Sequence, residues 1–76
     1  MSTCNIDHSK DDVYNKLVNQ KQFLPAELFE AANIFLDKET TQQELNELFH
    51  LLKKYDLATS EEQEKRNHAI QELVQR

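Results

Sequence analysis

The strongest constraint on the fold is the amphipathic pattern of residues 41–57, TQQELNELFHLLKKYDL. On a helix, where each residue turns by about 100°, the apolar side chains of this stretch fall on one side. They are Leu45, Leu48, Phe49, Leu52 and Tyr55, with Leu51 at the border of the stripe. A buried leucine or phenylalanine contributes roughly 1.5–3 kcal/mol relative to an exposed one, so another surface must cover the stripe.

The chain has 76 residues, no glycine and a single proline. Tight β-turns and phosphate-binding loops depend on glycine, so neither hairpins nor nucleotide-binding loops are expected. The composition predicts an all-α fold, a small bundle of three to four short helices around a helical hairpin. One core of this size gives little net stability, which makes a dimer an expected state.

Two helices are predicted in the first half of the chain. Ser9 followed by Asp12 is an N-cap pattern, and a helix is expected over about 10–21. Its apolar face is small, so an alternative is that it orders only on contact with the rest of the domain. A proline in the first turn loses no hydrogen bond, so the second helix should begin at Pro25 and cover about 25–37. The apolar face of the first helix consists of Val13, Tyr14, Leu17 and Val18.

The third helix is predicted over about 41–56. Thr41 with Glu44 forms a capping-box pattern, and the neighbouring residue Thr40 offers the same pattern one register earlier. The polar connection before this helix is short, which favours an antiparallel hairpin of the second and third helices.

The last helix is predicted over about 60–75 and is divided in character. Its first half, EEQEKRNH, is polar on every side, and an apolar patch follows. We interpret the polar half as a solvated stretch that carries an apolar tip to the core; the alternative is a docking surface for another protein. The patch consists of Ala69, Ile70, Leu73 and Val74. Residues 1–8 show no periodicity and are expected to form a flexible tail on a single helical domain, residues 9–76.

Charge and composition narrow the function. The formal net charge is −5 and the pI is about 5.0, which argues against a broad basic surface for nucleic acid or anionic membranes. Direct DNA binding is therefore disfavoured, although a composite basic face remains an alternative. One cysteine excludes an internal disulfide and fits a reducing compartment. Without a long apolar run or a signal-like N-terminus, the chain is expected to be cytoplasmic, with no membrane insertion.

Residue types that carry chemistry are sparse. Cys4, His8, His50 and His68 could in principle form a zinc set, but no CxxC or HxxxH pair occurs. The carboxylates are better explained by helix capping and solubility than by acid–base pairs. We therefore expect no enzyme, catalytic residue, metal, cofactor or small-molecule substrate.

The third and fourth helices, LNELFHLLKKYDLATSEEQEKRNHAIQELV, resemble the small biofilm-development and acid-resistance regulators of the AriR/YmgB type, the two-component-system connector proteins. The matching features are an apolar helix, an exit through Ala58, Thr59 and Ser60, a Glu- and Gln-rich opening and the closing apolar patch. The resemblance implies an all-helical homodimer with an Hha-like fold. It also implies a non-enzymatic modulator of a bacterial phosphorelay that controls biofilm, surface polysaccharide and acid stress.

The leading interpretation is a regulator that acts by protein–protein contact and offers apolar anchors inside an acidic rim that selects a basic signalling or regulatory partner. The alternative is a small acidic inhibitor that blocks a nucleic-acid-binding or catalytic cleft, such as a phage-borne antagonist or an immunity-type protein. The candidate interface residues are Leu28, Ile34, Phe35, Leu48, Leu51, Leu52 and Tyr55.

Overall fold

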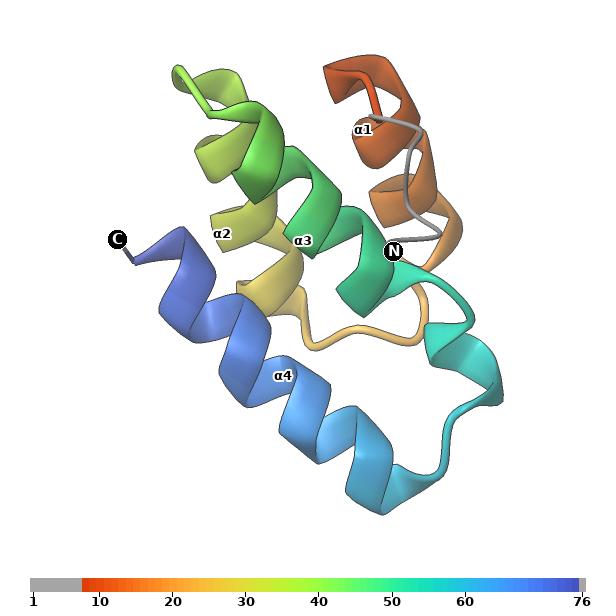
Figure 1. Cartoon of the computed structure of the whole chain (residues 1–76). Helices are drawn as coiled ribbons and strands as arrows, with labels where there is room; N and C mark the ends of the chain where they lie inside the picture. The colour runs from red at the N-terminus through yellow and green to blue at the C-terminus, as the bar shows by residue number, and fades with distance from the viewer. Residues whose placement is uncertain (1–7, 76) are drawn as a thin grey trace, which may run out of the picture.

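The computed structural model describes residues 8–75, and its regular structure is entirely helical (Figure 1). The elements in chain order are α1 (Lys10–Asn19), α2 (Ala26–Asp37), α3 (Gln42–Leu52), the short 3-10 helix η1 (Tyr55–Leu57) and α4 (Ser60–Val74). The predicted all-α bundle is confirmed. No helix within the described residues is long and apolar enough to cross a bilayer.

The helix starts follow the capping signals. The hydroxyl oxygen of Ser9 caps α1, and that of Thr59 caps α4, each by accepting a backbone N–H of the first turn. At α3, Thr41 and Glu44 form a complete capping box, in which each side chain accepts the backbone N–H of the other at 3.1 and 2.9 Å. The structure thus uses the Thr41 register. Pro25 takes the N-cap position of α2, so this helix begins at Ala26, one residue after the predicted start.

The helices pair as two consecutive hairpins, α1 with α2 and α3 with α4, stacked on each other. Across the stack α1 packs on α3 and α2 packs on α4, whereas α2 and α3 make only minor contact. This differs from the predicted hairpin of the second and third helices. The backbone is extended at Lys38 and again at Thr41, and although the chain reverses at this connection, α3 crosses α2 without packing along it (Figure 1).

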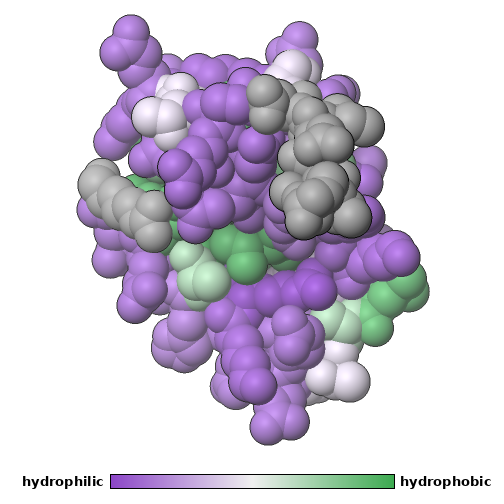
Figure 2. Space-filling model, viewed as in Figure 1, coloured by the Kyte–Doolittle hydropathy of each residue, from purple (hydrophilic) through white to green (hydrophobic). Residues whose placement is uncertain are grey.

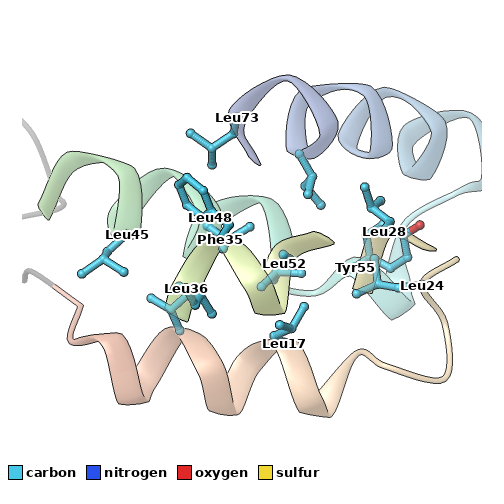
Figure 3. Packing of buried hydrophobic residues seen from close by; sticks show 13 residues of the cluster. Leu17, Leu24, Leu28, Phe35, Leu36, Leu45, Leu48, Leu52, Tyr55 and Leu73 are labelled. Carbon is cyan, nitrogen blue, oxygen red and sulfur yellow. The ribbon is translucent and has the colours of Figure 1, made fainter. Parts of the chain in front are cut away.

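A single apolar cluster fills the space between the hairpins and draws on every helix (Figure 3). Leu48 and Leu52 of α3 are fully buried in it, and Tyr55 of η1 is 1% exposed. On α1 the predicted apolar face is only half used, because Tyr14 and Val18 are more than 40% exposed. The cluster consists of Val13, Leu17, Leu24, Leu28, Ala32, Phe35, Leu36, Leu45, Leu48, Leu52, Tyr55, Ile70 and Leu73.

The third helix ends earlier than predicted, at Leu52 instead of residue 56. Lys54 then takes a left-handed conformation with φ 57° and ψ 26°, which reverses the chain before η1. The guanidinium of Arg66 donates to the carbonyl of Lys53 at 2.7 Å, so α4 holds the residue that ends α3. A contact from another helix thus determines where α3 ends, and the apolar periodicity of α3 alone cannot predict that position.

His8, which the sequence assigns to the tail, is fixed on α3. Its N–H donates to Oδ1 of Asn46 at 3.0 Å, and its carbonyl accepts from Nε2 of Gln42 at 2.7 Å. Its ring stacks on Phe49 with 3.6 Å between centroids and 12° between planes. The rest of the predicted tail, residues 1–7, lies outside the described residues.

Candidate protein-binding groove between α3 and α4

The structure buries most of the predicted interface residues inside a single chain. Their exposed fractions are Leu28 9%, Phe35 7%, Leu48 0%, Leu52 0% and Tyr55 1%. The amphipathic pattern that marked them is satisfied by the other helices of the same chain, so these side chains are not surface anchors. The interface prediction narrows to Ile34, which is 57% exposed, and Leu51, which is half-buried.

Leu51 lies in an open groove of about 540 Å³ between α3 and α4, called here the α3–α4 groove. The four residues on α4 are three or four positions apart, and so are Glu47 and Leu51 on α3, so each of these sets shares one helical face. On the space-filling surface, a small apolar area opens in the middle of this face and is ringed by polar residues (Figure 2). The lining residues are Glu47, His50 and Leu51 of α3 and Glu62, Arg66, Ala69 and Glu72 of α4.

The floor of the groove is apolar. Leu51 packs against the outside of the core cluster and keeps part of its surface in solvent. Ala69 faces it from α4 and is also half-buried. A small residue beside a leucine leaves a shallow depression, which can receive one apolar side chain of a partner.

The rim of the groove is acidic. Its walls bear three carboxylates, Glu47, Glu62 and Glu72, against the one guanidinium of Arg66. Nε of Arg66 pairs with Oε2 of Glu62 at 3.2 Å, and Nη1 donates to the carbonyls of Lys53 at 2.7 Å and Leu51 at 3.4 Å. The only arginine of the groove is thus occupied in joining α4 to the end of α3, and the net charge of the lining is negative.

The polar half of α4 also makes hydrogen bonds to the turn that precedes it. Nε2 of Gln63 donates to the carbonyl of Tyr55 at 2.9 Å, and Oδ1 of Asn67 accepts the Tyr55 hydroxyl at 2.6 Å. From the C-cap of α1, Nε2 of Gln20 donates to Oδ1 of Asp56 at 3.1 Å. The predicted solvated stretch therefore fixes η1. Gln63 and Asn67 are amides one helical turn apart within a charged run, a spacing that could have indicated their shared role.

The turn that α4 holds displays an exposed leucine. Leu57 is 76% exposed, the largest value among the apolar side chains that the structure leaves open. It lies in η1, on the connection between the two helices that form the groove. Single exposed leucines are common on protein surfaces, so this one is not by itself evidence for a site.

Ile34 and Leu51 do not form one patch. Ile34 lies on α2 and is not among the residues that line the α3–α4 groove. A second, smaller groove of about 270 Å³ separates α2 from α4, with Leu28, Ala31 and Val74 among its lining residues. Ile34 and Leu51, the two accessible interface candidates, therefore lie on separate surfaces, and each needs its own test.

The metal-ligating residue types do not gather in the part of the chain that the structure describes. No group of three or more His, Cys, Asp or Glu side chains there is arranged to hold a metal ion. The rings of His8 and His50 approach edge to face at 5.8 Å between centroids, while His68 is exposed on α4. Cys4, the remaining member of the set considered from sequence, lies outside the described residues.

Comparisons with protein-family models, curated proteins and solved structures give no match to this chain.

Proposed function

We propose that this protein is a non-enzymatic regulator that acts by contact with another protein, and that the α3–α4 groove is its contact surface. The observation that carries the proposal is the half-buried pair Leu51 and Ala69 at the floor of an open groove with an acidic rim. Binding sites for protein partners commonly combine a central apolar anchor with a polar rim.

A finer proposal is that the partner belongs to a bacterial phosphorelay that controls biofilm, surface polysaccharide and acid stress. Its support is the resemblance of the third and fourth helices to the connector regulators. Those two helices are also the ones that form the groove.

We further propose that the protein forms a homodimer through Ile34. The support is the exposure of this isoleucine, 57%, on a helix whose other large apolar side chains are buried or half-buried. In this arrangement, self-association leaves the α3–α4 groove open to the partner.

A second candidate function is a small acidic inhibitor. The carboxylates around the groove favour it, because an acidic surface can occupy a basic nucleic-acid-binding or catalytic cleft. Stoichiometry separates the two functions: an inhibitor of this kind binds one enzyme as a monomer, whereas the connector binds a signalling protein as a dimer.

Affinity capture from a bacterial lysate, with mass spectrometry of the bound proteins, tests the groove. The bait is compared with a Leu51→Asp variant and with a Leu57→Asp control, which places the same change on an exposed residue that does not line the groove. A captured protein is then purified and its affinity for all three baits is measured by calorimetry. We expect Leu51→Asp to abolish binding and the control to retain it; equal binding by both variants would refute the groove as the contact surface.

A further inference from the structure

We infer that the occupant of the α3–α4 groove is a basic amphipathic helix of about three turns. One apolar side chain of this helix would lie over Leu51 and Ala69, with lysine or arginine residues on either side against the rim. This inference rests on the proposed function, because it names the partner chemistry of the same site.

The length of the groove suits a helix. On α4 the lining residues run from Glu62 to Glu72. At 1.5 Å per residue this separation is about 15 Å, or close to three helical turns. Packed helices approach to roughly 8–10 Å between axes, with small side chains at the contact allowing the closer approach. Ala69 is the small residue on this wall.

The groove also disfavours an extended peptide. Both walls are helices, whose backbone N–H and C=O groups are bonded within each helix, so there is no sheet edge to which a strand could add. An extended segment over Leu51 and Ala69 would leave its own backbone groups without partners on an apolar floor. A helix satisfies those groups internally and presents only side chains.

The charge of the rim selects a basic helix. Three carboxylates surround the floor, and the single guanidinium already donates to Glu62 and to two carbonyls. Lysine or arginine on the flank of the partner would meet Glu72 on the α4 wall. The net charge of −5 on the whole chain adds a longer-range attraction for a cationic segment.

A second copy of this chain is a poorer occupant. The most exposed large apolar residue on its α-helices, Ile34, is flanked on α2 by Glu27, Glu30 and Asp37. Seating that face in the groove would place these acids against the acidic rim, where like charges repel. The inference therefore commits to a basic helix from a different protein.

Titration with synthetic peptides tests this chemistry, with backbone amide chemical shifts of the isotope-labelled protein as the readout. The basic probe is an alanine-based helical peptide of about 15 residues, because shorter isolated helices are marginal in water. It carries leucine along one stripe and lysine on both flanks. Two matched probes replace every lysine by glutamate or every leucine by serine.

We expect the basic probe alone to bind, with its largest shifts at Leu51, Arg66 and Ala69. Glu72→Lys should weaken this binding about tenfold, since it reverses a charge at the contact. The matched control Glu64→Lys makes the same change at an exposed α4 residue that does not line the groove, and should alter the affinity less than about twofold. Ala69→Leu should fill the depression and block the probe without a change in charge.

Three results would overturn the inference: no binding by the basic probe, equal binding by the glutamate probe, or equal effects of Glu72→Lys and Glu64→Lys. Chemical shifts confined to another surface would overturn it too. If the lysate experiment succeeds while the peptide fails, the groove binds a protein of other chemistry and the proposed function survives. If the peptide binds while Leu51→Asp still captures the partner, the proposed function fails instead.

Discussion

The phenolic hydroxyl of Tyr55 donates a hydrogen bond of 2.6 Å to Oδ1 of Asn67, which joins the turn after α3 to the middle of α4. Tyr55 is 1% exposed, so its ring contributes to the core while its hydroxyl fixes the neighbouring helix. The carbonyl of the same residue accepts from Gln63, one turn earlier on α4. The two bonds set where α4 lies against α3, and with it the width of the groove.

Removing this hydroxyl should weaken the fold without disturbing the core packing. We expect Tyr55→Phe to lower the free energy of unfolding by about 1 kcal/mol, because the part-buried oxygen of Asn67 loses its donor. Urea denaturation gives the difference. Tyr14→Phe is the control, since Tyr14 is 44% exposed and should change stability by less than about 0.5 kcal/mol. Equal effects of the two variants would contradict the role of this bond.

Two adjacent threonines should respond in opposite ways. Thr41→Ala removes the hydroxyl that accepts the Glu44 N–H, one of the two hydrogen bonds of the capping box. It should lower the free energy of unfolding by about 1 kcal/mol. The Thr40 hydroxyl oxygen is buried without a hydrogen-bond partner, so Thr40→Val should be neutral or stabilising. Thermal unfolding followed by circular dichroism distinguishes them. A larger loss from Thr40→Val would show that the Thr40 hydroxyl has a partner in solution.

Arg66 should contribute more to the stability of the fold than its exposed neighbour Lys65 on α4. Arg66→Met keeps much of the aliphatic stem but removes the donors to the carbonyls of Leu51 and Lys53, and should cost roughly 1–2 kcal/mol. The exposed residue beside it provides the matched change, Lys65→Met, for which we expect less than about 0.5 kcal/mol. Chemical denaturation of both variants measures the contrast, and no difference would mean that the carbonyls are satisfied by water instead.

Aspartate substitutions separate the surface from the core. If the proposed homodimer forms through Ile34, Ile34→Asp should weaken self-association and retain the helix content, because this side chain is 57% exposed. Leu48→Asp should instead unfold the chain, because it places an unpaired carboxylate at a fully buried position. Light scattering coupled to size exclusion and far-ultraviolet circular dichroism give the two readouts. An Ile34→Asp protein that remains dimeric at low concentration would exclude Ile34 from the interface.

The sequence predicts what depends on local chemistry. The caps at Ser9, Thr41 and Thr59 each begin a helix, because a cap is a contact between residues three apart. Ile34 is two residues from the buried Ala32, a spacing that places the two on opposite sides of a helix, and it is exposed.

Other features depend on contacts between distant residues. At the end of α3, the carbonyls of Leu51 and Lys53 accept from Arg66 of α4, which is more than ten residues away. The pairing of α2 with α4 follows from the shape of the whole cluster. Candidate interface residues are the hardest to predict, since a stripe of apolar residues has the same pattern whether the same chain or another protein covers it. Only the structure shows that Leu48 is fully buried and that Leu51 is half-buried.

The stacking of α1 on α3 and of α2 on α4 has a consequence for how the protein loses its structure. Each hairpin supplies the surface on which the other buries its leucines, so neither half retains a core when the other is removed. We therefore expect cooperative unfolding, in which the domain passes between folded and unfolded chains without a stable half-folded form. The α3–α4 groove belongs to the second hairpin in sequence, yet it exists only while the first hairpin is in place.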